Sequence, residues 1–356
     1  VTAVHAALLP SPRLRLDGVT LGEAGDAKIA ELRVVPALAS IFAETWELKT
    51  VEADGLFLGQ DALARLPDWA GVRGGERVRV GRIVLKDAQI EARGVAVPHL
   101  DGEIFLTPQG RLEKARVSSV DGKLNVNVTP RSDGEFNLAI RARDWQPPLW
   151  PGLSVDELDA TAVAGRDGLD VGRLDGSAYG GTFKGVAALD WRQGWRAEGT
   201  LQMENVGLSG LMRALGAGEK SLALSGRLDA TLRYTLHSAE LAGLLDAPRL
   251  QGTFTCRDGA IQNLDLGRGF RVRERERVMG GATRFGRLTG TLSAEAGRYR
   301  FHQLRLTASQ MAASGEAEVA PDGRLSGSAN VDVAIAALPS RSRLTLGGRV
   351  QQPELH

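Results

Sequence analysis

Apolar and polar residues alternate along most of the chain, and this period of two predicts β-strands with one apolar face. The clearest stretch covers residues 123–128, and the same alternation resumes at residues 136–141 after Pro130 and an Asp-Gly pair. Together they predict an antiparallel hairpin whose apolar side chains share one face. Those residues are Leu124, Val126, Val128, Phe136, Leu138 and Ile140.

Turn signals separate the alternating segments. Asp-Gly occurs nine times, and the pair predicts tight turns because glycine accepts a positive φ. The glycines of these pairs are Gly18, Gly55, Gly102, Gly122, Gly134, Gly168, Gly176, Gly259 and Gly323. Four short helices are predicted from their capping and terminating residues, at 36–47, 61–69, 209–215 and 238–245.

A degenerate repeat of the form Leu-x-Gly-x-apolar runs through the second half of the chain. Its copies begin at Leu174, Leu224, Leu250, Leu288, Leu325 and Leu346. A glycine in mid-strand marks a bend, a bulge or the close approach of another group. Because the spacing of the copies is irregular, the repeat predicts one long meander that can curl, and not a solenoid of fixed period.

These patterns predict an all-β fold: a long, curled, mostly antiparallel sheet with a few short α-helices. The helices cannot cover the apolar face of so many strands. Two arrangements remain, a packed sandwich and an open trough that holds a ligand. Aromatic residues make up only 5% of the chain, so the lining is mainly aliphatic, which suits flexible acyl chains. Leu288 and Leu292 join the six hairpin residues as the expected lining of the groove.

Charge and composition exclude several classes of function. The 44 basic and 43 acidic residues give a net charge of +1, which argues against a nucleic-acid binder. The five histidines show no metal-ligand spacing, and the one cysteine, Cys256, cannot form an intramolecular disulfide. No nucleophile elbow, phosphate-binding loop or zinc motif is present. The chain is therefore predicted to be no enzyme, with no catalytic residue, no metal and no cofactor.

Several motifs in the second half, taken in their order, resemble a known family. They include residues 179–185 (YGGTFKG), 283–290 (TRFGRLTG) and 304–309 (LRLTAS). This region resembles the C-terminal domain of the AsmA-like family of bacterial envelope proteins. Residues 11–58 look like the N-terminal part of such proteins. A Pro- and Trp-rich stretch at 145–151 divides the chain, so we expect an N-terminal region at 1–145 and a C-terminal domain at 146–356.

The resemblance implies a periplasmic protein anchored to the inner membrane by an N-terminal helix absent from this chain. It implies a non-catalytic, lipid-binding protein that carries phospholipid along an apolar β-groove between the inner and outer membranes. The partners are then phospholipid acyl chains and the two membranes. The alternative function is an assembly or scaffold factor for outer-membrane proteins, which would bind them by strand addition at a sheet edge.

Overall fold

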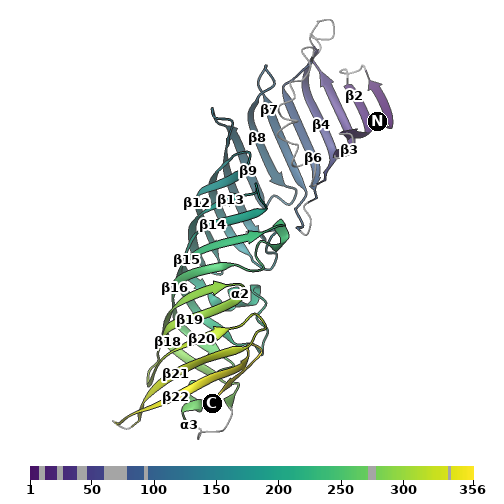
Figure 1. Ribbon diagram of the computed structural model, residues 1–356. Coiled ribbons are helices and arrows are strands. Elements are labelled where there is room, and N and C mark those ends of the chain that lie inside the picture. The colour runs from purple at the N-terminus through teal and green to yellow at the C-terminus, as the bar shows by residue number, and fades with distance from the viewer. Residues whose placement is uncertain are drawn as a thin grey trace. The chain divides into compact units, whose positions relative to one another are not determined.

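The computed structural model describes residues 1–7, 13–21, 27–37, 46–59, 78–91, 95–271, 278–335 and 338–356. Its 23 strands belong to one long, open and mostly antiparallel sheet (Figure 1). The described residues contain two α-helices, α2 (Leu208–Ala214) and α3 (Leu266–Arg271). The prediction of an all-β fold with a few short helices is confirmed.

The chain divides into two compact units. Unit 1 comprises Val1–Leu149 and Leu158–Gly172, and unit 2 comprises Trp150–Glu157 and Arg173–His356. Two strands, β11 (Val155–Ala164) and β12 (Gly168–Ala178), contribute residues to both units.

Unit 1 is a meander in which most strands pair with their sequence neighbours in antiparallel fashion. The exception is β4, which pairs in parallel with β5 and β6. The strands are β1 (Ala3–Ala7), β2 (Arg13–Leu21), β3 (Ala27–Pro36), β4 (Trp46–Leu58), β5 (Val78–Val80), β6 (Arg82–Ile90), β7 (Leu100–Leu106), β8 (Leu112–Ser119), β9 (Leu124–Pro130) and β10 (Phe136–Trp145).

Unit 2 continues as an antiparallel meander, but its last strands return to earlier ones. The short β17 pairs with β23, and the N–H of Leu222 donates to the carbonyl oxygen of Val350 at 2.6 Å. The C-terminal strands therefore curl back toward the start of β15. The strands are β13 (Gly181–Asp190), β14 (Trp195–Gly207), β15 (Ala223–Ser238), β16 (Arg249–Gln262), β17 (Val278–Met279), β18 (Ala282–Glu295), β19 (Arg298–Thr307), β20 (Met311–Val319), β21 (Leu325–Ile335), β22 (Leu338–Arg349) and β23 (Gln352–Leu355).

The four helix predictions have different outcomes. The segment 209–215 corresponds to α2, whereas within 238–245 only a 3-10 turn forms, at Leu241–Gly243. Of 36–47, Pro36 ends β3 and Trp46 and Glu47 begin β4, so the helix is wrong at these positions. Residues 38–45, and all of the predicted helix at 61–69, lie outside the described residues.

Only some of the Asp-Gly pairs form turns between strands. Gly122, Gly134 and Gly323 have positive φ values in such turns, and Gly168 begins β12 after one. The other five pairs lie within strands, so the turn prediction is wrong there. Gly18 and Gly55 keep a positive φ inside β2 and β4, where the glycine permits a local irregularity that other residues resist. The remaining three glycines are Gly102, Gly176 and Gly259.

Candidate functional site: the apolar faces of the two units

The apolar face of unit 1 consists of rows that cross the strands in register. One row starts at Val4 of β1 and ends at Ile140 of β10, and it contains no polar side chain. Its members in order are Val4, Leu16, Leu32, Ala53, Leu85, Gly102, Val117, Val126 and Ile140. Eight steps between strands of about 4.8 Å give this row a length of roughly 38 Å.

A second apolar row runs beside the first. Its members are Ala6, Leu14, Val34, Val51, Ile83, Ile104, Ala115, Val128 and Leu138. Most of the larger side chains in both rows are only half-buried, as Leu16, Ile83, Val117 and Val128 illustrate. The two rows together we call the unit 1 apolar face. Ordinary soluble proteins expose single, scattered apolar side chains, whereas this face is one continuous apolar surface.

Four of the six predicted hairpin residues belong to the two rows, and the other two lie on the same side of the sheet. In the register of β9 and β10, Val128 faces Leu138 and Val126 faces Ile140. Leu124 and Phe136 occupy the outer positions, opposite Ala142 and Pro130. All six are half-buried, whereas the alternate residues, including Asn125, Asn127, Asn137 and Arg141, are exposed. Whether the six contact lipid stays a prediction.

The opposite face of unit 1 is charged, and its charges compensate one another. Arg15 lies 2.8 Å from Asp17 and 2.9 Å from Glu31, both carboxylate contacts. Glu52 lies 3.5 Å from both Arg33 and Lys86. The Arg15 guanidinium, as hydrogen-bond donor, lowers the pKa of Asp17 below its ordinary value. This network of ion pairs makes one side of the unit 1 sheet polar, in contrast to the apolar rows on the other side.

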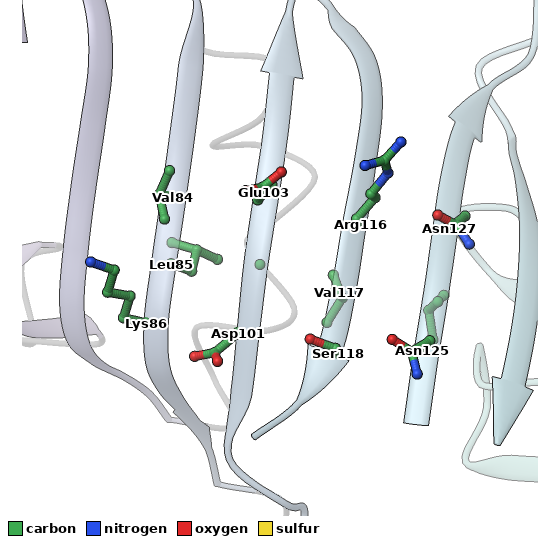
Figure 2. A pocket seen from close by; sticks show the side chains of 12 residues that line it. Val84, Leu85, Lys86, Asp101, Glu103, Arg116, Val117, Ser118, Asn125 and Asn127 are labelled. Carbon is green, nitrogen blue, oxygen red and sulfur yellow. The ribbon is translucent and has the colours of Figure 1, made fainter. Parts of the chain in front are cut away.

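The charged side carries a shallow concavity of about 390 Å³ across β6, β7, β8 and β9 (Figure 2). Three consecutive residues of each strand line it, and eight of the twelve belong to the polar rows. These eight are Val84, Lys86, Asp101, Glu103, Arg116, Ser118, Asn125 and Asn127. Acidic and basic groups are mixed in this lining, so it favours neither an anion nor a cation.

The unit 2 apolar face also consists of rows in register, but glycines interrupt them. One row crosses nine strands from β13 to β22 with no polar side chain. Its members are Gly185, Leu201, Leu232, Gly252, Leu292, Phe301, Ala317, Gly327 and Leu346. A neighbouring row contains Phe183, Met203, Ala230, Phe254, Gly290, Leu304, Gly315, Ala329 and Leu344.

Large side chains lie over these glycines. A Cβ atom at Gly290 would meet Leu304 Cδ2 at 2.7 Å and the Phe254 ring at 3.1 Å. A Cβ atom at Gly252 would lie 2.7 Å from Leu232 Cδ2 and 2.1 Å from the carbonyl oxygen of Thr231. Both glycines are the central residues of Leu-x-Gly-x-apolar copies. The repeat therefore brings neighbouring strands and side chains closer than any other residue would allow.

The two predicted lining residues of unit 2 lie in different environments. Leu288 is 5% exposed and belongs to a packed core with Cys256, Leu306 and Val331. Residues of α2 and α3, such as Leu208 and Leu266, complete this core. Leu292 is half-buried, opposite Gly252 and Phe301. The packed position of Leu288 makes it a core residue, so Leu292 is the better candidate for contact with a ligand.

Two observations concern metal-binding and nucleophilic groups in the parts of the chain that the structure describes. No group of three His, Cys, Asp or Glu residues could hold a metal ion there. Burial raises the pKa of the Cys256 thiol to about 11, which keeps it protonated and unreactive at neutral pH. No described helix has the length and apolarity needed to cross a membrane.

Comparison with known proteins gives no relative for this chain. No family model, curated protein or solved structure matches it. The resemblance to the AsmA-like family therefore stays a prediction from the motifs.

Most residues of the unit 1 apolar face were not singled out from the sequence. Leu14 and Leu16 lie in a short alternating segment, which is the signal that could have found them. Ile83 and Leu85 carry no such signal, because they join the rows through the parallel pairing of β6 with β4. Register between strands that are distant in sequence is not readable from periodicity alone.

Proposed function

We propose that the apolar faces hold the acyl chains of phospholipids and that the protein carries these lipids between membranes of a bacterial envelope. The observation that supports this most directly is the unbroken apolar row of unit 1, from Val4 to Ile140, with most of its larger side chains half-buried. Such a surface costs free energy in water unless something covers it.

Acyl chains fit this face for a physical reason. The rows consist mainly of Leu, Val, Ile and Ala, and they offer no hydrogen-bond partner from a side chain over roughly 38 Å. Each methylene group that leaves water contributes about 0.8 kcal/mol. A lipid that moves along such a face keeps its chains out of water at every step, so no catalytic residue is needed.

The resemblance to envelope proteins supplies the setting of the proposal. The protein would be periplasmic, attached to the inner membrane by a segment that precedes this chain, and its route would lead to the outer membrane. The half-buried row offers many similar apolar positions along its length, which agrees with movement along a path better than with storage of one molecule.

The first experiment identifies what the protein carries. The chain is purified without detergent from a bacterial host, and bound molecules are extracted and identified by mass spectrometry. We expect phospholipid in an amount comparable to that of the protein. A protein free of lipid that instead binds unfolded outer-membrane proteins would contradict the proposal and favour the scaffold function.

The second experiment tests the face itself with a matched pair of variants. Val126→Asp places a carboxylate in the apolar row, whereas Asn127→Asp places the same carboxylate one residue away on the polar face. Acyl chains that cover a carboxylate remove it from water, which costs free energy. Val126→Asp should therefore lose most of the bound lipid, and Asn127→Asp should keep it. Because Val126 is half-buried, the stability loss should stay near 1 kcal/mol. Equal lipid content in both variants would overturn the assignment of this face.

A further inference from the structure

Arginines face each other directly on the polar side of unit 2. Arg227 of β15 is in register with Arg257 of β16, and Arg257 is in register with Arg287 of β18 (strands in Figure 1). Arg284 of β18 and Arg305 of β19 lie in the adjoining rows, opposite Ala260 and Thr289. These five residues we call the arginine surface.

The positive charge of this surface is only partly compensated. The guanidinium of Arg257 lies 2.5 Å from the Asp229 carboxylate, and Arg227 donates to the carbonyl oxygen of Asn205 at 3.3 Å. Within the described part of the chain, Arg284, Arg287 and Arg305 form no ion pair. Like charges on directly opposed strands destabilise a sheet, so this arrangement has a cost in the isolated protein. An anionic partner would reverse the sign of that contribution.

The chemistry around the arginines favours a lipid surface over a protein partner. Threonines occupy several neighbouring positions on the same side of these strands, namely Thr253, Thr255, Thr289, Thr291 and Thr307. Specific protein interfaces centre on buried aromatic or apolar anchors, and these rows offer none. A bilayer that contains anionic lipids attracts clustered basic residues by charge alone. Guanidinium groups also match the geometry of phosphate oxygens.

We propose that the arginine surface docks unit 2 onto the phosphate groups of an anionic lipid bilayer. Asp229 and the exposed Asp258 offset two of the five charges, so three remain in excess. Each basic residue near an anionic membrane contributes a factor of about five in affinity. The arginine surface lies on the face opposite the apolar rows, so this docking and the carriage of acyl chains can fail independently.

The test uses the full chain and sedimentation with vesicles. One set contains phosphatidylcholine alone, and the other contains equal parts of phosphatidylcholine and phosphatidylglycerol with the same acyl chains. We expect binding to the anionic vesicles only, with a marked loss at about 0.15 M salt, where the Debye length falls to ~8 Å. Equal binding to both sets would show that the apolar faces are responsible and would overturn the proposal.

A matched pair of double variants assigns the binding to this surface. Arg287→Gln with Arg305→Gln removes two charges that have no carboxylate partner among the described residues, and affinity for anionic vesicles should fall about 30-fold. Arg324→Gln with Arg341→Gln makes the same change in net charge, but these two arginines are paired with Asp322 and Asp332. The control pair should lose less than about three-fold. Equal losses in the two double variants would overturn the assignment.

Discussion

The two units use the same alternation of apolar and polar residues, yet they present different apolar surfaces. The row of unit 1 that ends at Ile140 contains one glycine, Gly102, and no aromatic ring. The row of unit 2 that ends at Leu346 contains three glycines and Phe301. In unit 2 large residues can lie over small ones, so the sheet curls and part of the face packs into a core. Unit 1 also has a buried cluster, which includes Ala53 of the row, and Leu16, Leu32 and Leu85 pack against it. The two faces therefore share the alternation and a packed part, and they differ in the size of the residues along the rows.

The polar faces differ as well. In unit 1, Arg15 and Arg33 stand opposite each other in register, but both are paired. Arg15 contacts Asp17 and Glu31 in the adjoining row, and Arg33 contacts Glu31 and also Glu52, which follows it in the same row. In unit 2, Arg287 and Arg305 have no such neighbour within the described residues. The contrast is local: the opposed arginines of unit 1 are paired with carboxylates, whereas Arg287 and Arg305 of unit 2 are not paired with any described carboxylate.

The largest expected effect separates the packed part of unit 2 from its open part. Leu288→Asp buries a carboxylate in the core and should destabilise the protein by about 3–5 kcal/mol. Leu292→Asp, four residues along the same strand, should cost about 1–2 kcal/mol because water reaches the half-buried position. Urea unfolding monitored by tryptophan fluorescence measures both. Equal losses would mean that the whole unit 2 face is a closed core.

A smaller effect tests the role of glycine in each unit, and the two results should differ in sign. A Cβ atom at Gly252 would lie 2.1 Å from a backbone oxygen, so Gly252→Ala should destabilise by about 1–3 kcal/mol. The first atom that a Cβ at Gly102 would meet is Leu85 Cδ1 at 3.4 Å, an ordinary contact. Gly102→Ala should therefore stabilise by about 0.5 kcal/mol through the unfolded chain. Thermal unfolding of the two variants gives both signs, and a destabilised Gly102→Ala would show that unit 1 is as tightly packed as unit 2.

The smallest effect concerns pH. Hydrogen bonds from Arg300 and Arg298 lower the pKa of Glu318 below its ordinary value of 4.5. Since the folded pKa is the lower one, the stabilising contribution is present above pH 4.5 and is lost as the pH falls through the folded value. The exposed position of the cluster keeps the effect small. Glu318→Gln should slightly flatten the fall of stability at acid pH. Above about pH 6, which lies well above the pKa of Glu318 in both the folded and the unfolded chain, the stability profile should run parallel to that of the parent. An unchanged fall at acid pH would show that Glu318 contributes nothing to the acid dependence of stability.

Local patterns predicted the strands well, because successive side chains of a strand point to opposite faces of the sheet and so produce an alternation with period two. Residues 123–128 and 136–141 have the predicted alternation in the structure, with each half of the hairpin in the expected orientation. The fold class followed from many such segments. The Asp-Gly turns failed where the pair lies inside a strand, since a positive φ at Gly18 or Gly55 serves an irregularity as well as a turn.

Features that depend on the register between strands could not be predicted from the sequence. Helix α3 was missed because it is short and glycine-containing, although Asp265 gave a signal: its carboxylate accepts the N–H of Arg268 at 2.8 Å, as a capping residue does. The alignment of Arg227 with Arg257 depends on one irregularity between Ser225 and Arg227, where the register of β15 and β16 shifts by one residue and Asp258 of β16 has a positive φ. Alternation carries no information about that displacement.

The return of β23 to β17 has a consequence for how the chain folds. Most pairings join strands that follow each other closely, so a meander of this kind can grow by local steps, each with a small loop-closure entropy. The contact between Val278 and Leu355 instead closes almost the whole second half of unit 2 into one loop. It can form only after the intervening strands are in place, so it is expected to be the last and slowest event. Once formed, it ties β23 to β17 near the middle of unit 2, so the strands between them are expected to unfold as one cooperative block.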